Sequence, residues 1–326
     1  MSVGALLVPG LPGGPSFGAG DLVRLGVRAE ALGLDRVGVS DHLLHRAGAH
    51  DPVAVLGALA AATERVRIES AVLQLPLRHP VQVAQSFTTL DHLSGGRVEL
   101  GVGIGGEDPD EHRAVGLDPR RRAQRADEAL SLLPALWSGE PVTFSGRQFA
   151  LDAVTLAPRP VQRPHPPIVV GGRASAALDR AARLAQRWDG IFLDPTQYAR
   201  RAAELDERAG WLGRTVGKGL VAWICTGASV TASAAMLADV LPSFYGVGWE
   251  RLARFALWGP PARCAGRLAE LREAGATDFL LIPVGEPDRQ LEALAETAEQ
   301  LGPAMVDARP AEAVAAGAAP VGAAPR

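Results

Sequence analysis

The sequence predicts an α/β fold, a single (β/α)8 TIM barrel with a hairpin-containing insertion before the fifth strand. Short apolar runs rich in β-branched residues alternate with longer segments of helical period, which is typical of βα units around a parallel sheet. Eight such runs occur, and a closed parallel barrel needs eight strands. The chain has 326 residues, a length at which α/β barrels often form one domain.

Each predicted strand is a short, largely apolar run. In chain order the strands are expected at Gly4–Val8, Arg36–Ser40, Val66–Leu73, Arg97–Gly103, Pro167–Gly171, Gly190–Leu193, Leu220–Thr226 and Asp278–Pro283. The helices are expected at Asp21–Leu32, Pro52–Thr63, Pro80–Leu93, Arg121–Trp137, Ser175–Gln186, Thr196–Ala209, Thr231–Val240 and Pro261–Ala274. Asp21, Ser175 and Thr231 are the expected N-caps, because short polar side chains can accept a hydrogen bond from the first turn.

The interval Ser138–Pro166 departs from this alternation, because it contains no long amphipathic helix. Two short runs, Val142–Phe144 and Gln148–Leu151, flank a Ser-Gly-Arg turn, and this pattern predicts a β-hairpin. We therefore expect one barrel domain over residues 1–305 with an insertion at about 138–166. The tail over 306–326 is rich in Ala and Pro and is predicted to be disordered.

Composition argues against several classes of partner. The 33 Lys and Arg residues are outnumbered by 36 Asp and Glu residues, so no basic surplus is available to neutralise nucleic-acid phosphates. No stretch approaches the roughly 18 uninterrupted apolar residues of a membrane span. Cys225 and Cys264 are too few for a disulfide framework or a zinc ligand set. We expect no nucleic-acid, membrane or metal partner, and a cytoplasmic location.

The candidate catalytic pair is Asp41-His42, which follows the second predicted strand. In a parallel barrel the active site lies at the carboxyl ends of the strands, where this pair falls. A carboxylate lies there beside an imidazole, the side chain that ordinarily titrates near neutral pH and often transfers protons. The alternative interpretation is an Asp N-cap next to a solvated histidine.

A candidate anion site, Gly171-Gly172-Arg173-Ala174-Ser175, joins the fifth strand to a helix. Backbone N–H groups at a helix N-terminus attract phosphate, glycine permits close approach, and Arg173 adds positive charge. An ordinary βα turn is the alternative.

The run from Gly101 to Gly106 has the pattern GxGxxG, but it does not fit a dinucleotide-binding turn. The acidic group Glu107–Glu111 follows it instead of a helix, and carboxylates there would repel a pyrophosphate. The glycines indicate that the backbone passes close to a flat ligand, or that the strand end is simply glycine-rich. The acidic group is interpreted as solvated loop rather than a cation site.

These motifs together resemble the bacterial luciferase-like superfamily of flavin- and deazaflavin-dependent barrels. The resemblance covers roughly residues 3–305. It is carried by Thr63–Ile68, Pro76–Pro80, Thr89–Arg97, Leu100–Gly103, Leu136–Gly139, Pro158–Pro164 and Pro166–Gly172, in this order.

The resemblance implies a tricyclic ring at the mouth of the barrel and a phosphate near the fifth strand. The phosphate contacts would be Gly171, Gly172, Ala174 and Ser175, and the ring contacts Asp41, Ile104 and Gly105. Family members also carry a cis non-prolyl peptide at the end of the third strand, behind the ring. It is expected at Ala71–Val72, or at Ser70–Ala71 in a shifted register, and implies ring contacts from Ala71, Val72 and Leu73.

Two cofactors are compatible with the resemblance, coenzyme F420 and FMN. The Asp41-His42 pair is similar to the F420 branch, in which a histidine here can act in proton transfer. Dehydrogenases of that branch carry a Glu directly after the fourth strand's Thr-Gly. Here Ile104-Gly105 is followed by Gly106, and the carboxylate is Glu107, one residue later. This departure argues against a sugar-phosphate dehydrogenase; His42 and Glu107 are the candidate catalytic residues, with the base unassigned.

The first hypothesis is an F420-dependent oxidoreductase that transfers a hydride between C5 of the deazaflavin and a small organic substrate, with His42 relaying a proton. The second is an FMN-dependent two-component monooxygenase, which takes reduced flavin from a partner reductase and reacts with oxygen. The third is a flavin-binding protein without turnover. Dimerisation is common in the family, so a homodimer is expected. Loops at Pro9–Phe17, His42–Asp51, Ser138–Pro166 and Phe244–Trp258 are expected to shape the substrate pocket.

Overall fold

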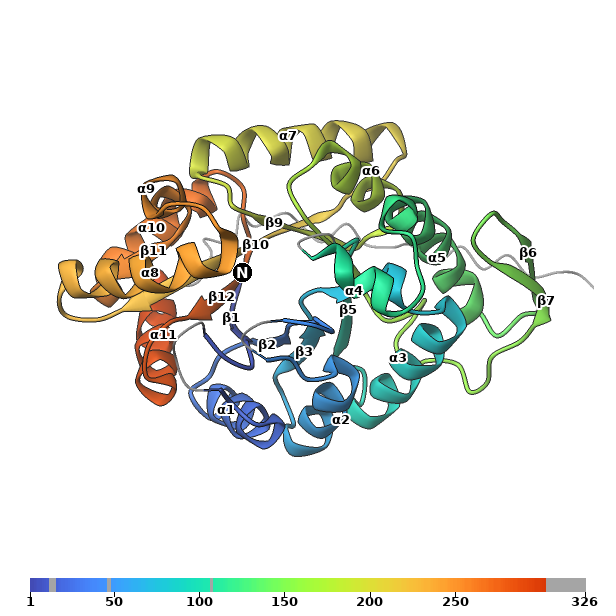
Figure 1. Cartoon of the computed structure of the whole chain (residues 1–326), viewed down its shortest axis with the longest axis horizontal. Helices are drawn as coiled ribbons and strands as arrows, with labels where there is room; N and C mark the ends of the chain where they lie inside the picture. Colours follow the sequence, from blue (N-terminus) through green and yellow to red (C-terminus); the bar gives the residue numbers. More distant parts are fainter. Residues whose placement is uncertain (12–15, 46–47, 106–107, 303–326) are drawn as a thin grey trace, which may run out of the picture.

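Eight parallel strands form a closed ring in the computed structural model, which describes residues 1–11, 16–45, 48–105 and 108–302 (Figure 1). Around the ring these strands are β1 (Ser2–Leu7), β2 (Arg36–Val39), β3 (Arg67–Ser70), β5 (Val98–Gly103), β8 (Ile168–Gly171), β9 (Arg187–Ile191), β10 (Gly217–Thr226) and β12 (Asp278–Pro283). Parallel pairing of β12 with β1 and of β9 with β10 completes the ring. The predicted (β/α)8 barrel is confirmed. The short strands β4 (Leu73–Gln74) and β11 (Leu257–Gly259) pair in parallel with β5 and β10.

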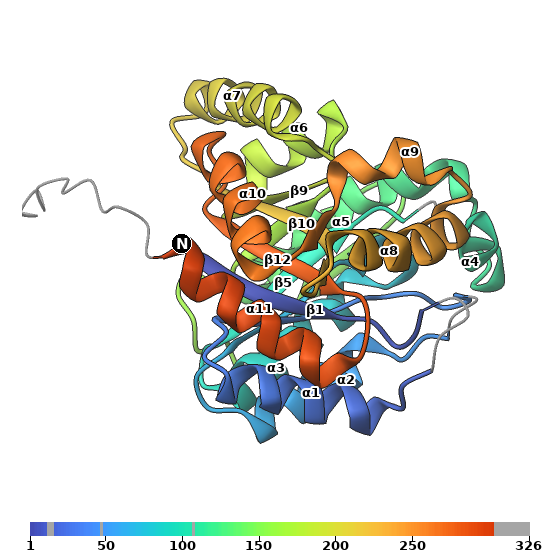
Figure 2. The same cartoon turned by 90° about the vertical axis from the view of Figure 1, so that its left-hand side faces the viewer.

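Helices surround the ring and cover its outer face (Figure 1). The longer ones are α1 (Ala19–Ala31), α2 (Pro52–Ala62), α3 (Pro80–Ser94), α5 (Arg122–Trp137), α6 (Ser175–Leu184), α7 (Pro195–Trp211), α8 (Val230–Tyr245), α10 (Pro261–Glu273) and α11 (Pro287–Leu301). The short helices are α4 (Pro109–Ala114) and α9 (Trp249–Leu252), and single 3-10 turns lie at Leu75–Leu77, Pro119–Arg121 and Ala253–Phe255. In Figure 2, α4, α8 and α9 lie at the end of the barrel opposite the start of β1, which is the carboxyl end of the strands.

Helix α11 was not among the predicted helices, although it closes the barrel wall. It packs against α10 and α1, and its buried face carries Leu291 and Leu294. Arg24 and Arg28 of α1 pair with carboxylates of α11 on the exposed side. Within the described residues, no single helix is both long and apolar enough to cross a bilayer. Val230–Tyr245 and Trp249–Phe255 meet that test only as a pair, and they are bent by 95°.

Several element boundaries and N-caps differ from the prediction. Strand β9 begins at Arg187 rather than Gly190, because the charged residues that start it are buried inside the barrel. The predicted third strand, Val66–Leu73, is interrupted after Ser70 and resumes as β4. The expected N-caps Asp21, Ser175 and Thr231 lie one to three residues inside their helices, and the observed N-caps are Gly18, Ala174 and Ser229.

The insertion between α5 and β8 contains the predicted hairpin. Strands β6 (Val142–Ser145) and β7 (Ala150–Val154) pair antiparallel and project from the side of the barrel (Figure 1). The Glu128 carboxylate of α5 accepts backbone N–H groups from the turn, including that of Gln148 at 2.8 Å. The hairpin is therefore tied to the barrel by hydrogen bonds. The predicted disordered tail, 306–326, lies outside the described residues.

Charged side chains fill the barrel interior toward the amino ends of the strands. Of the described residues they are Arg36, Glu69, Glu99, Arg187, Asp189 and Asp278, and we call them the ionic cluster. Arg187 is at its centre, because its guanidinium donates to Glu69 at 2.5 Å, to Glu99 at 2.5 Å and to Asp189 at 2.7 Å. Acids outnumber arginines, so the cluster holds more negative than positive charge when all its members are ionised.

This imbalance separates the pKa values of two neighbouring carboxyl groups. Burial raises the pKa of Glu69 to about 7. Burial also opposes ionisation of Glu99, but the guanidinium groups of Arg187 and Arg36 outweigh it and lower the pKa of Glu99 to about 2. Glu69 is therefore the cluster member that takes up a proton most readily near neutral pH.

The substitution Glu69→Gln is expected to remove a pH dependence of stability. Because the folded-state pKa of Glu69 lies above its ordinary value of 4.5, its stabilising contribution is complete below that value and is lost as the pH rises through 7. The free energy of unfolding of E69Q, relative to the unmodified protein, should thus rise by up to about 3 kcal/mol between about pH 4.5 and pH 8. Urea denaturation across this range measures the difference; a constant difference would contradict it.

Candidate active site

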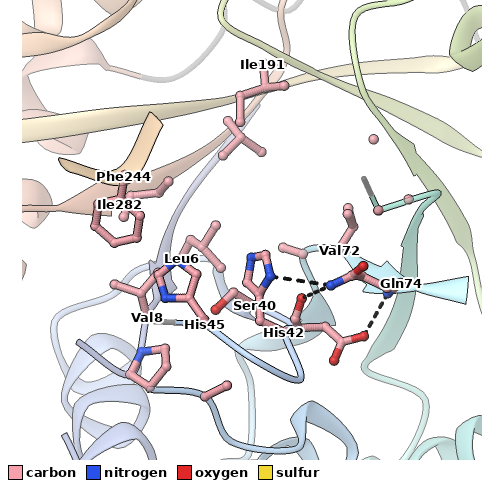
Figure 3. Close-up of a pocket in the computed structure, with 18 of the residues that line it drawn as sticks. Leu6, Val8, Ser40, His42, His45, Val72, Gln74, Ile191, Phe244 and Ile282 are labelled. Atoms are coloured by element: carbon pink, nitrogen blue, oxygen red, sulfur yellow. Dashed lines mark hydrogen bonds between the residues drawn. The ribbon is translucent and has the colours of Figure 1, made fainter. Parts of the chain in front are cut away.

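A cavity of about 320 Å³ opens at the carboxyl ends of the strands, where the sequence placed the active site. One wall is apolar, and it is formed by Leu6, Ile191, Val221, Trp223, Phe244 and Ile282. The polar side chains of Ser40, Asp41, His42, Gln74 and Glu111 also line the cavity. Figure 3 shows His42 and Gln74 facing the side on which Phe244, Leu6 and Ile282 lie. The cavity thus combines an apolar space with one polar edge.

The structure brings most of the predicted site residues to this cavity. Those that line it are Asp41, His42, Ala71, Val72, Ile104, Gly105, Gly171 and Gly172. Leu73 is fully buried and does not line it, while Ala174 and Ser175 lie at the start of α6 beyond its wall. Arg173 lines a second cavity instead. The candidate catalytic residue Glu107 lies outside the described residues.

The Asp41 carboxylate is a structural anchor beside His42. It forms a two-pronged ion pair with the guanidinium of Arg78, one contact of which is 3.0 Å, and accepts the backbone N–H of Gln74 at 2.8 Å. The backbone carbonyl of Asp41 accepts from the Gln74 side chain at 3.1 Å. These contacts fix the turn after β2 against the segment after β3, and so fix the backbone that carries His42. No role for Gln74 or Arg78 was predicted from the sequence.

Glu111 is a further polar residue of the site that was not predicted from the sequence. Its side chain is 1% exposed, and its carboxylate lies 3.3 Å from Nδ1 of His42. The carboxylate accepts the backbone N–H groups of Leu43 at 2.6 Å and Leu44 at 3.2 Å, and the side-chain amide of Gln74 at 2.7 Å. Burial alone would raise the pKa of Glu111, but these hydrogen bonds outweigh it and lower the pKa below its ordinary value. Glu111 is therefore an ionised partner of His42.

The interpretation of Glu107–Glu111 as solvated loop is wrong for Glu111. This residue lies on the buried face of α4, which packs across the mouth of the barrel. A signal for that helix was present, because Asp108 caps its N-terminus and Pro109 occupies its first position. A helix predicted from that signal would have placed Glu111 on the face that lies toward the strands.

The cis peptide predicted by the family resemblance is present between Ala71 and Val72. The Val72 side chain lies against two strand-end glycines. A Cβ at Gly103 would approach Val72 to 2.6 Å, and one at Gly171 would approach it to 2.8 Å. Glycine is thus required at both positions by packing within the protein, which supports the structural interpretation of the glycine-rich strand end. Together these residues form a smooth wall of the cavity.

The turn from β8 into α6 presents open backbone donors beside the cavity. No hydrogen-bond acceptor among the described residues binds the backbone N–H groups of residues 173–176. Gly172 has a φ of +124°, its N–H donates to the Asp189 carbonyl at 3.1 Å, and its carbonyl accepts from the Trp188 indole at 2.6 Å. Strand β9 therefore holds the turn while the donors that follow it stay available for an anion.

The N-cap of α6 makes this terminus unusually open. Ala174 occupies the cap and has no side-chain acceptor, so the first turn lacks the internal partner that Ser, Thr or Asp would supply. The Ser175 hydroxyl points elsewhere: it donates to Glu204 at 3.1 Å and accepts from Arg201 at 3.3 Å, both on α7. The N–H groups, rather than this hydroxyl, are the candidates for binding a phosphate.

A second cavity, of about 610 Å³, adjoins this turn. Arg173, Arg251 and Arg254 line it, together with one carboxylate, Glu250, and aromatic side chains that include Tyr245. Tyr245 also lines the first cavity, so the two spaces share a wall. We call this space the arginine cavity. Its charge favours an anionic occupant. In the described part of the chain, no group of three His, Cys, Asp or Glu side chains could hold a metal ion.

Two curated relatives differ in the cofactor that their names state. An F420-dependent glucose-6-phosphate dehydrogenase from Microbacterium testaceum (strain StLB037) is 39% identical over 210 residues, which cover 61% of this chain and 61% of the relative. An FMNH2-dependent dimethylsulfone monooxygenase from Pseudomonas putida is 31% identical over 198 residues, which cover 59% of this chain and 53% of the relative. The chain thus spans at most 61% of the length of these relatives.

Solved structures share the whole barrel. A monooxygenase from Streptomyces bottropensis has a TM-score of 0.82 at 25% identity, covering 92% of this chain and 98% of its own. An F420-dependent secondary alcohol dehydrogenase in complex with an F420-acetone adduct also has a TM-score of 0.82, with the same coverage, but at 21% identity it shows the fold alone. A family model described as luciferase-like monooxygenase matches residues 1–245. Because that match includes 245 of the 326 residues, the chain belongs to the luciferase-like monooxygenase family.

Proposed function

We propose that this protein is an oxidoreductase that uses coenzyme F420 and a small uncharged substrate. The observation that carries the proposal is one arrangement: an apolar cavity edged by His42, next to a helix N-terminus with open N–H groups. A planar ring fits against the smooth wall of Val72, Gly103 and Gly171, and its phosphate fits the N–H groups at the start of α6. The curated F420-dependent relative supports this cofactor.

Bound F420 would supply hydride chemistry at C5 of its ring. His42 would handle the proton that accompanies the hydride. In alcohol oxidation, one ring nitrogen of His42 takes the hydroxyl proton as the carbonyl forms; in the reverse direction it returns that proton to the oxygen. Asp41, held by Arg78, keeps the His42 backbone in place and transfers no proton in this scheme. Candidate ring contacts are Ile104 and Gly105, which line the same cavity.

The arginine cavity favours F420 over FMN. The side chain of F420 extends past its phosphate as an acidic peptide, whereas FMN ends at the phosphate. The arginine cavity adjoins the turn that would hold the phosphate, and its three guanidinium groups face one carboxylate. An acidic extension would gain charge pairing there that FMN could not.

The double substitution R251A/R254A is therefore expected to weaken F420 binding and leave FMN binding unchanged. Two partly exposed charge contacts are worth about a 2- to 30-fold change in Kd. Fluorescence titration of the protein with each cofactor measures it. The double variant R24A/R28A, on the outer helix α1, is the matched control and should bind F420 normally. Equal increases in the Kd of F420 and of FMN would mean that the two arginines act on the phosphate, which both cofactors carry, and would contradict a contact with the acidic extension.

The walls of the first cavity favour a small, uncharged substrate. Asp41, Glu111 and Asp189 line it, and within the described residues no Lys or Arg does. A phosphate dianion there would face carboxylates without a counter-charge. This argues against glucose 6-phosphate, the substrate in the name of one relative, and for a small alcohol or carbonyl compound. Assembly as a homodimer, cooperation with a reductase and a cytoplasmic location stay predictions.

The experiment that tests the proposed function titrates the purified protein with F420 and with FMN and then assays turnover. We expect F420 to bind at micromolar concentration and to be reduced by a member of a panel of small alcohols, or oxidised by a carbonyl compound. Tight FMN binding with oxygen consumption in the presence of a flavin reductase would replace the proposal with the monooxygenase. Tight F420 binding with no turnover over alcohols, imines and enones would favour the binding protein.

A further inference from the structure

The ring of His42 has two nitrogens, and the contacts around it determine which one carries the proton of the neutral side chain. We infer that Glu111 is a positioning residue that holds the proton of His42 on Nδ1 and thereby leaves Nε2 as the proton acceptor on the cavity side. The inference about the proton position stands on geometry alone. Its consequence for turnover rests on the proposed function.

The side-chain amide of Gln74 has no hydrogen available to donate to His42. Its Nε2 contacts three groups: the Glu111 carboxylate at 2.7 Å, the Asp41 carbonyl at 3.1 Å and Nδ1 of His42 at 3.4 Å. Figure 3 shows the contact between Gln74 and His42. An amide nitrogen has two hydrogens, and the two shorter contacts, both to oxygen acceptors, use them. No hydrogen is left for His42. A flipped Gln74 would place its oxygen against both of those oxygens, so the orientation is fixed.

The carboxylate of Glu111 faces Nδ1 of His42. Glu111 Oε1 lies 3.3 Å from Nδ1 of His42. If Nδ1 were bare, its lone pair would face a carboxylate oxygen without an intervening proton, which is repulsive. With a proton on Nδ1, the positive end of the N–H group lies toward the carboxylate, and the same contact becomes attractive. A neutral imidazole carries one proton, so Nε2 is bare.

Glu111 is suited to this role because its own position is fixed from several sides. The backbone N–H groups of Leu43 and Leu44, which directly follow His42, both donate to Oε1. The carboxylate therefore binds the histidine ring and the backbone after it at once. Among the described residues, His45 is a second titratable group against the ring, with ring centroids 4.8 Å apart. Asp41 does not compete for Nδ1, because its carboxylate is paired with Arg78.

The test is Glu111→Gln, with Asp110→Asn as the matched control. Asp110 lies one residue earlier on α4, and its side chain is 66% exposed. The substitution Asp110→Asn removes the same charge as Glu111→Gln. In E111Q the shape is kept, but one of the two contacts toward Gln74 and His42 must place an amide donor against a donor. The proton of the neutral His42 ring then no longer prefers Nδ1, and both tautomers become populated.

The deciding measurement is the proton–nitrogen NMR spectrum of cofactor-free protein labelled at the histidine nitrogens, with H42A identifying the His42 signals. We expect the neutral ring to be protonated on Nδ1 in the unmodified protein and in D110N, and to become a mixture in E111Q. Protonation on Nε2 in the unmodified protein, or no change in E111Q, would overturn the inference. If E111Q fails to fold, the spectrum of the unmodified protein still decides.

Turnover provides the second readout. In E111Q we expect kcat to fall about 10- to 100-fold with little change in KM or in F420 affinity, as for other residues that orient a catalytic ligand. D110N should match the unmodified protein. Absence of F420 turnover in every variant, together with the expected NMR spectra, would contradict the proposed function but leave the assignment of the proton to Nδ1 intact.

Discussion

Replacing Arg187 by methionine is expected to lower the free energy of unfolding by about 3–5 kcal/mol, the usual cost of removing one partner from a buried ion pair. The Arg187 side chain is only 8% exposed, and its guanidinium donates to Glu69, Glu99 and Asp189. Without it, carboxylates from three strands of the barrel would share a buried space with Arg36 as the remaining internal cation. Urea denaturation near neutral pH, followed by circular dichroism, measures the change.

Arg24→Met is the matched control for this prediction. Arg24 pairs with Asp288 on the surface, where its side chain is 53% exposed. Removal of that exposed pair should cost at most about 1 kcal/mol. If R187M proves as stable as R24M, the ionic cluster does not hold the barrel together in the way described. A shift of R187M toward greater stability at acid pH would agree with it, because protonation removes the repulsion among the remaining carboxyl groups.

Replacing His42 by alanine is expected to reduce F420-dependent turnover about 100- to 10,000-fold, the range for loss of a general acid–base group. The side chain lines the cavity, and its Nδ1 is engaged by Glu111, so Nε2 is the nitrogen available to a substrate. Initial rates over a range of pH measure the effect. F420 affinity, measured by fluorescence titration, should change little because the helix N-terminus that would bind the phosphate is separate.

His92→Ala is a suitable control for this second prediction. His92 lies on the outer helix α3, and its ring contacts the carbonyl of Arg159 at 2.9 Å. H92A should retain normal turnover. Full turnover in H42A, with an unchanged pH profile, would remove His42 from the mechanism and direct attention to the other polar residues of the cavity wall.

Most of the fold could be predicted because the alternation of strand and helix patterns is local in sequence. The start of β9 could not be predicted, because Arg187 and Asp189 are residue types that usually lie in solvent. Here their charges are paired inside the barrel, and the partners Glu69 and Glu99 come from other strands. Helix α11 also escaped prediction. Its buried leucines depend on packing against α1 and α10, which are brought beside it by closure of the barrel.

Site residues could be predicted where the barrel topology alone determines their position. Gly171 ends β8, and Asp41 and His42 lie two and three residues after the end of β2, so closure of the barrel alone brings them to one mouth. Glu111 and Gln74 reach the site through short segments whose direction depends on hydrogen bonds made after folding. Residue spacing does not encode those bonds, although Asp108 and Pro109 marked the start of the helix that carries Glu111. The sequence therefore indicated the candidate imidazole but not the carboxylate beside it.

The ionic cluster also has a consequence for the order of binding. Because Arg36, Glu69, Glu99 and Arg187 fill the interior toward the amino ends of the strands, the cavity opens at the carboxyl ends. Under the proposed function, a cofactor ring on the wall of Val72 and Gly171 and its substrate would share this opening, so a bound substrate would hinder release of the cofactor. Cofactor residence time, rather than substrate affinity, would then govern how many turnovers follow each loading.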